Sequence, residues 1–140
     1  MNIRAKSFID RVLAFNKMYG LARPENPTAP TQERLQQFNR ALRDEVEELS
    51  GVCLTRDSPS CTDLDVLVEY ADLLGDLVVY CTSEAVRHGI PLPAVLSIIM
   101  DSNESKLGAD GNPIIRDGKV QKGPNYWKPE PKIRELLEGA

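Results

Sequence analysis

One predicted helix, over residues 63–88, constrains the fold most, because it is apolar on both sides of a narrow acidic stripe. At about 100° per residue, the side chains of this stripe point within about 60° of one another. They belong to Asp65, Glu69, Asp72 and Asp76. Such a stripe is usually a solvated face, but a helix that is apolar nearly all round is buried. Buried carboxylates need cations or raised pKa values, so the pattern predicts a packed helix that binds a cation.

A second acidic cluster lies on the preceding predicted helix, which begins after Thr31 and ends at about Gly51. Glu45 and Glu48 are about one turn apart, at the edge of this helix's apolar stripe, whereas Glu47 points well away from them. Two such helices facing each other would form a cage of carboxylate oxygens, the hard ligands that Mg²⁺ and Mn²⁺ prefer. We therefore expect a metal site between the two helices.

Helical periodicity also predicts helices over residues 3–19 and 93–106 and a short terminal helix over 131–137. Between the last two, Asp110-Gly111 and Asp117-Gly118 are turn formers on either side of β-prone residues, which indicates a small hairpin followed by an extended arm. We expect an all-α fold, an antiparallel bundle of about four main helices with a short C-terminal β-hairpin and arm. Residues 1–140 would form a single domain, with 107–140 as its tail.

The composition of the 140 residues, with 41% hydrophobic and 27% charged side chains, is that of an ordinary soluble protein. A net charge of −4 argues against a broad electrostatic contact with a nucleic acid polymer. No apolar run approaches the length that spans a bilayer, so no membrane contact is expected. Three cysteines without CxxC spacing argue against a disulfide scaffold or a zinc site and fit a reducing cytoplasm.

The two acidic clusters resemble the EExxE and ExxD motifs of the all-α nucleotide pyrophosphohydrolases, the MazG-like superfamily. The matching segments are Asp44-Glu45-x-x-Glu48 and Glu69-x-x-Asp72, with Asp44 standing where the family commonly has Glu. Residues 101–126 are similar to the SNMSK…DGK…KGPNY ending of short MazG-like proteins of bacteria, integrons and phages, with Glu104 in place of a usual Met. The resemblance covers most of residues 30–130.

This resemblance implies a hydrolase that cleaves (deoxy)nucleoside triphosphates between the α- and β-phosphates, giving a monophosphate and pyrophosphate. Two or three Mg²⁺ ions per site, for which Mn²⁺ can substitute, would be held by Glu45, Glu48, Glu69 and Asp72. The catalytic residues would be Asp44, Glu45 and Glu48, with Asp44 or Glu45 orienting the attacking water or taking its proton. The substrate would contact Asp76, Asn103, Lys106, Lys119, Lys122 and Tyr126.

The resemblance also implies a homo-oligomer, either a dimer or a dimer of dimers, in the cytoplasm of a bacterium or of a phage-infected host. Two alternatives remain open, a metal- and nucleotide-binding sensor without turnover and a pyrophosphohydrolase of the phosphoribosyl-ATP type. The sequence does not select the base, whose recognition we expect in the N-terminal helix, the Pro-rich loop and a partner chain. Purine nucleotides, dGTP among them, are the first substrates to test. We expect His88 to cap a helix and Trp127 to stack on a base or to pack the arm against a neighbouring subunit.

Overall fold

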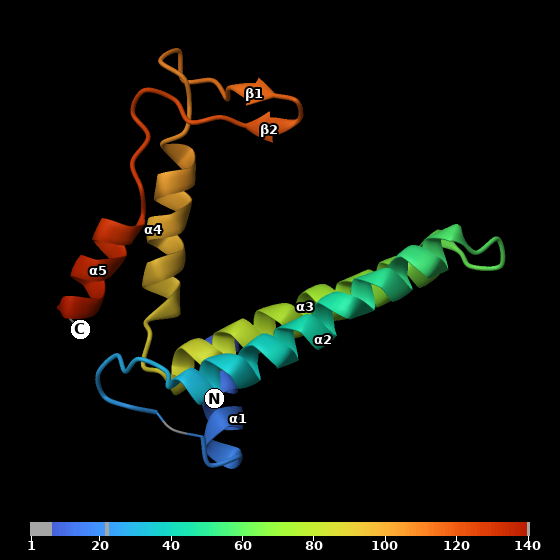
Figure 1. Cartoon of the computed structure of the whole chain (residues 1–140), viewed down its shortest axis with the longest axis horizontal. Coiled ribbons are helices and arrows are strands. Elements are labelled where there is room, and N and C mark those ends of the chain that lie inside the picture. Colours follow the sequence, from blue (N-terminus) through green and yellow to red (C-terminus); the bar gives the residue numbers. More distant parts are fainter. Residues whose placement is uncertain (1–6, 22, 140) are drawn as a thin grey trace, which may run out of the picture. The chain divides into compact units, whose positions relative to one another are not determined.

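The computed structural model describes residues 7–21 and 23–139 of the chain, which form five helices and one two-stranded hairpin (Figure 1). In chain order these are α1 (Phe8–Met18), α2 (Gln32–Asp57), α3 (Asp63–Arg87), α4 (Leu92–Glu104), β1 (Ile115–Arg116), β2 (Lys119–Val120) and α5 (Glu130–Glu138). This confirms the predicted fold class, a mostly helical chain with a short C-terminal hairpin. The chain divides into two compact units, residues 1–89 and residues 90–140.

The first unit is built on α2 and α3, which lie side by side as a long antiparallel pair, with α1 packed on α3 (Figure 1). Side-chain caps define where these helices begin, because an N-cap oxygen satisfies a backbone N–H that has no partner within the helix. The Thr31 hydroxyl accepts a hydrogen bond from the Arg34 N–H at the start of α2. Thr62 and Asp65 form a reciprocal capping box at the start of α3.

The predicted end of α2 at Gly51 was wrong, because the helix continues to Asp57 and leaves only a short loop before α3. Glycine is a weak helix former, at a cost of about 1 kcal/mol relative to alanine. The apolar contact that follows it outweighs this cost, since Val52 is buried. The predicted helices over 63–88, 93–106 and 131–137 are confirmed to within two residues at each end. Residues 3–6 of the predicted first helix lie outside the described part of the chain.

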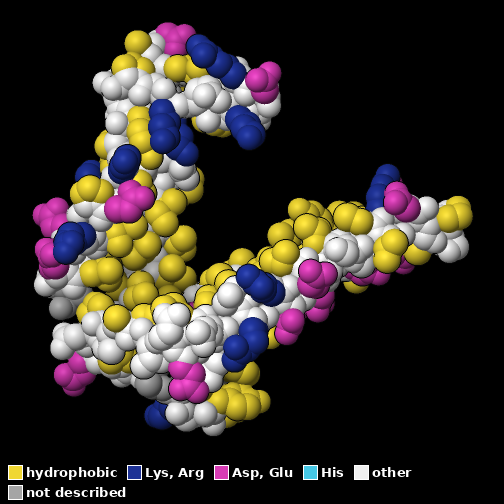
Figure 2. Space-filling view, in the orientation of Figure 1, with side chains coloured by type: hydrophobic (Ala, Val, Ile, Leu, Met, Phe, Trp, Pro, Cys, Tyr) yellow, Lys and Arg dark blue, Asp and Glu magenta, His cyan; other side chains and the backbone are white. Residues whose placement is uncertain are grey.

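The hydrophobic core of the described residues is small. Only Val12, Val52, Leu73 and Ala85 are buried apolar side chains among them. Large apolar side chains are exposed along α2 and α3, where Figure 2 shows a nearly continuous hydrophobic band. The described helices include none that is both long and apolar enough to cross a membrane.

The second unit consists of α4, the hairpin, the arm and α5, with α5 packed against α4. The buried Ser102 hydroxyl of α4 donates to the carbonyl of Trp127 at 2.9 Å, and the Trp127 N–H donates to the Ser105 hydroxyl at 3.2 Å. The Lys132 ammonium lies 3.9 Å from the centre of the Trp127 ring. These contacts fix the arm on α4 of the same chain, so Trp127 has a packing role within the chain itself.

Candidate metal centre

Three carboxylates from the α2–α3 pair converge on one point. Glu45 and Glu48 of α2 and Asp76 of α3 each present an oxygen atom, and these three atoms lie within 4.8 Å of one another. Mg²⁺ binds oxygens at about 2.1 Å in an octahedron, which sets neighbouring ligand oxygens roughly 3–4 Å apart. A small movement of the three side chains towards one another would therefore bring their oxygen atoms to the spacing that Mg²⁺ requires.

Glu45 distinguishes this cluster from an ordinary solvated acidic patch. Its Oε2 atom is buried and has no hydrogen-bond partner among the described residues. Burial raises the pKa of Glu45 above 4.5, and the charges of Glu48, Asp76 and Asp72 raise it further, against an opposing hydrogen bond from Tyr80. A buried acceptor without a partner is costly and rare. A cation bound between the carboxylates would satisfy this oxygen and relieve the repulsion, so the donor set fits Mg²⁺ or Mn²⁺.

The structure distributes the predicted metal ligands over more than one place. Glu45 and Glu48 are in the cluster, and Asp72 is close enough to raise the pKa of Glu45. Glu69 instead accepts a hydrogen bond from the Thr55 hydroxyl at 2.7 Å. Of the four predicted ligands, α2 and α3 therefore bring Glu45 and Glu48 together, with Asp72 nearby. The fourth, Glu69, is hydrogen-bonded to Thr55.

The structure separates two further acidic residues of the predicted stripe, Asp76 and Asp65. Asp76, predicted to contact substrate, lies in the carboxylate cluster itself. Asp65 belongs to the same predicted stripe, but its carboxylate accepts the Thr62 backbone N–H at 2.7 Å. This backbone hydrogen bond, with one from the Thr62 hydroxyl, lowers the pKa of Asp65 below 3.8. Asp65 therefore caps α3 and takes no part in the cluster, from which the exposed Asp44 is also absent.

The predicted phosphate-binding residues lie in the second unit. The Lys106 ammonium donates to the Asn103 side-chain oxygen at 3.0 Å, so these two residues form a pair at the end of α4. The Lys122 ammonium lies 5.0 Å from the centre of the Tyr126 ring. Lys119 is on β2, directly opposite Arg116 of β1. Arg116 is a cation that the sequence analysis did not select.

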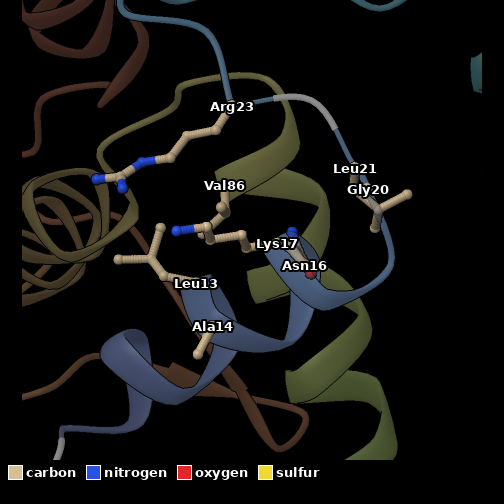
Figure 3. Close-up of a pocket in the computed structure, with 8 residues that line it drawn as sticks. All are labelled: Leu13, Ala14, Asn16, Lys17, Gly20, Leu21, Arg23 and Val86. Carbon is tan, nitrogen blue, oxygen red and sulfur yellow. The ribbon is translucent and has the colours of Figure 1, made fainter.

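A separate hollow of about 500 Å³ lies beside α1 in the first unit (Figure 3). Its walls include Leu13 and Val86, and the long side chains of Lys17 and Arg23 extend along it. Val86 follows Asp76 by ten residues on α3, about 15 Å at the helical rise. The hollow is therefore distinct from the carboxylate cluster, although it lies on the N-terminal helix where we expect base recognition.

His88 and Glu84, near the end of α3, form a second polar group in this unit. His88 is the C-cap residue of α3, as predicted, and its Nε2 atom is 2.7 Å from the Glu84 carboxylate. Arg34 at the start of α2 donates to the same carboxylate, with its Nε 3.1 Å from Oε1. This group ties the start of α2 to the end of α3 and is a structural contact.

Solved structures of other proteins are similar to this chain. No protein-family profile and no curated protein sequence matches the chain. The chain is similar in structure to a protein from Exiguobacterium sp. 255-15 to which NTP pyrophosphohydrolase activity is provisionally ascribed. The match has a TM-score of 0.52 and 20% sequence identity, over 97% of this chain and 100% of the other. At this identity the similarity establishes a shared fold.

Proposed function

We propose that the chain is a Mg²⁺-dependent nucleotide pyrophosphohydrolase that cleaves (deoxy)nucleoside triphosphates between the α- and β-phosphates. The observation that carries this proposal is the buried, unpartnered Oε2 of Glu45 within a cluster of three carboxylates. The shared fold with a protein of provisionally ascribed NTP pyrophosphohydrolase activity supports the same function. The resemblance of the two acidic motifs to the MazG-like superfamily implies that the bond between the α- and β-phosphates is the one that is cleaved.

In this proposal Glu45, Glu48 and Asp76 hold the first metal ion. Asp72 and Glu69 lie about one and two turns nearer the start of α3, and they would hold a second ion on the same side of the helix. Bound Mg²⁺ supplies positive charge for the phosphate oxygens and makes the attacking water more acidic. Asp44, at the exposed edge of α2, remains a candidate for orienting that water.

The phosphate chain of the substrate needs cations besides the metal, and the C-terminal part of the sequence contains three candidate lysines. Lys106, Lys119 and Lys122 are the cations we assign to the outer phosphate oxygens, because ammonium groups form strong charge-assisted hydrogen bonds with phosphate. Asn103 holds Lys106 at the end of α4 through the 3.0 Å hydrogen bond. Tyr126, beneath the Lys122 ammonium, positions that side chain.

A panel of nucleoside triphosphates tests the function, with the purine deoxynucleotides first. We expect pyrophosphate, rather than orthophosphate, to be released in the presence of Mg²⁺ and not in EDTA. Glu48→Gln and Asp76→Asn should each reduce turnover by more than about a hundredfold, since each removes a charged metal ligand.

Glu47→Gln is the matched control, because Glu47 is an exposed acid on the same turn of α2 that is absent from the cluster. It should retain wild-type turnover. Orthophosphate as the product would identify a different reaction, and nucleotide binding without any product would identify the sensor alternative. Full activity of Glu48→Gln or Asp76→Asn would remove the metal assignment.

A further inference from the structure

The hairpin of the second unit holds two cations directly opposite each other. Strands β1 and β2 are antiparallel, and their register pairs Arg116 with Lys119. The turn between them, Asp117-Gly118, has a positive φ at both residues, as a tight two-residue hairpin requires, so the pairing is held by the backbone. Like charges at directly opposed positions destabilise a strand pair. Both side chains are exposed, so a bound anion would reduce the repulsion between them.

A hollow on the same hairpin could hold an anion beside one member of this pair. It has a volume of about 470 Å³, and its lining includes Arg116, Gln121 and Lys122, whereas Lys119 lies outside it. The arm that carries Lys122 is fixed against the end of α4 by Gly123, whose N–H donates to the Lys106 carbonyl at 2.8 Å. A Cβ at this position would lie 1.9 Å from the Leu107 carbonyl oxygen, so only glycine permits the approach.

The charge of this region is opposite to that of the whole chain. Residues 106–122 carry four cations, Lys106, Arg116, Lys119 and Lys122, in a protein of net charge −4. Figure 2 shows Lys and Arg side chains on the hairpin and on the neighbouring end of α4. The structure gives none of the four an ion pair within the described part of the chain. The cations are thus unneutralised.

The two acids of this segment do not neutralise them. The Asp110 carboxylate accepts hydrogen bonds from the Asn112 backbone and side-chain nitrogens, at 3.0 and 3.2 Å. Asp117 is in the turn and forms no ion pair with Arg116 or Lys119 in the described structure. A surplus of positive charge around a polar hollow favours a ligand with several negative charges.

We propose that Arg116 is a further phosphate-binding residue, which acts with Lys119 and Lys122 as a hairpin site for the β- and γ-phosphates of the substrate. The proposal rests on the proposed function and adds a residue to it. The planar guanidinium of Arg116 can donate two parallel hydrogen bonds to one phosphate group, a geometry that the lysine ammonium cannot provide. A phosphate in the hollow would lie beside Arg116 and Lys122 and would reduce the repulsion that Arg116 receives from Lys119, its partner in the strand register.

The test uses inorganic tripolyphosphate, which has the phosphate chain without base or sugar, titrated calorimetrically into the full chain in EDTA. The wild type should bind it, with an affinity that falls as salt is raised. Arg116→Gln should weaken binding about tenfold, since it removes a charge-assisted pair of hydrogen bonds. Arg134→Gln is the matched control, because Arg134 is an exposed arginine of the same unit that pairs with Glu138 on α5 at 3.1 Å. It should change binding by less than about twofold.

Absence of tripolyphosphate binding by the wild type overturns the proposal, and so does equal binding by Arg116→Gln and the wild type. The titration contains no divalent metal and no hydrolysable nucleotide, so its outcome is independent of the turnover assay. If the enzyme hydrolyses nucleotides but Arg116→Gln leaves its tripolyphosphate affinity unchanged, the hairpin site is wrong and the proposed function stands. If the chain binds tripolyphosphate through Arg116 but hydrolyses no nucleotide, the hairpin site stands and the proposed function is wrong.

Discussion

Glu45 shows how a single side chain converts an acidic surface into a candidate site. Exposed acids in a cluster can remain separately solvated, and their repulsion is screened by water and salt. Glu45 differs because one of its oxygens, beside Glu48 and Asp76, is buried without a hydrogen-bond partner in the described part of the chain. Burial and repulsion both raise its pKa. A divalent cation is the ligand that satisfies the oxygen and the charges together.

Glu84 shows the opposite electrostatic balance at the residue scale. Burial alone raises the pKa of Glu84, but hydrogen bonds from Arg34 and His88, together with their charges, outweigh it and lower the pKa below 4.5. Because the unfolded chain takes up this proton first as the pH falls, the contribution of Glu84 to stability is fully present above about pH 4.5. It is lost as the pH falls through the lowered folded pKa. We expect Glu84→Gln to reduce the free energy of unfolding at pH 7 by about 1 kcal/mol, a figure discounted for partial exposure.

Chemical denaturation of wild type and Glu84→Gln between pH 3 and pH 7 measures this effect. The difference between the two proteins should be constant at neutral pH and should shrink below about pH 4.5. Glu47→Gln, on the exposed side of α2, should show no such pH-dependent difference. A difference that persists unchanged at the lowest pH would mean that the carboxylate charge does not hold Arg34 and His88.

At the scale of the helices, local signals predicted which elements form, but not how two of them align. The start of α3 was predictable because Thr62 and Asp65 form a capping box, which is visible in the sequence. The pairing of Glu45 and Glu48 with Asp76 was not predictable. Helical periodicity indicates which face of each helix is apolar or acidic, but it does not determine the axial position of one helix relative to the other. For the same reason the sequence could not show that Glu69 lies beside Thr55.

The end of α2 was mispredicted at Gly51, and this glycine gives a prediction for the helix. Gly51 lies in the interior of α2, it is exposed, and a Cβ added there meets no atom within 4 Å. Gly51→Ala should therefore raise the free energy of unfolding by about 1 kcal/mol, since alanine loses less conformational freedom in a helix. Thermal or urea denaturation at a fixed protein concentration measures the change.

Gly123→Ala is the matched comparison, because the same substitution there brings a Cβ within 1.9 Å of the Leu107 carbonyl oxygen. It should destabilise the second unit. If Gly51→Ala gave no stabilisation or lowered the stability, we would conclude that residues 52–57 are not helical in solution. The end of α2 at Gly51 that the sequence predicted would then be correct.

At the scale of the whole molecule, we propose that the chain forms a homo-oligomer, because the hydrophobic core of the described residues is small. Only four apolar side chains are buried in the described residues, while Leu54, Leu64, Leu67 and Val68 are each more than 60% exposed on α2 and α3. Contiguous exposed apolar surface of this kind marks interaction sites in soluble proteins. An isologous dimer would cover the same face of α2 and α3 on both copies. The sequence predicted this state through family resemblance, and the exposed faces now give it a physical reason.

Sedimentation analysis at micromolar concentration should show a dimer or a larger assembly for the wild type. Leu67→Lys should shift it towards the monomer, because it places a charge in the apolar face of α3 that the partner copy would cover. Ile115→Lys is the matched control, since Ile115 and Leu67 are both 61% exposed but Ile115 lies on the hairpin. The control should keep the wild-type assembly. A wild-type monomer with full pyrophosphohydrolase activity would contradict the homo-oligomer, because a single chain would then be sufficient for the reaction.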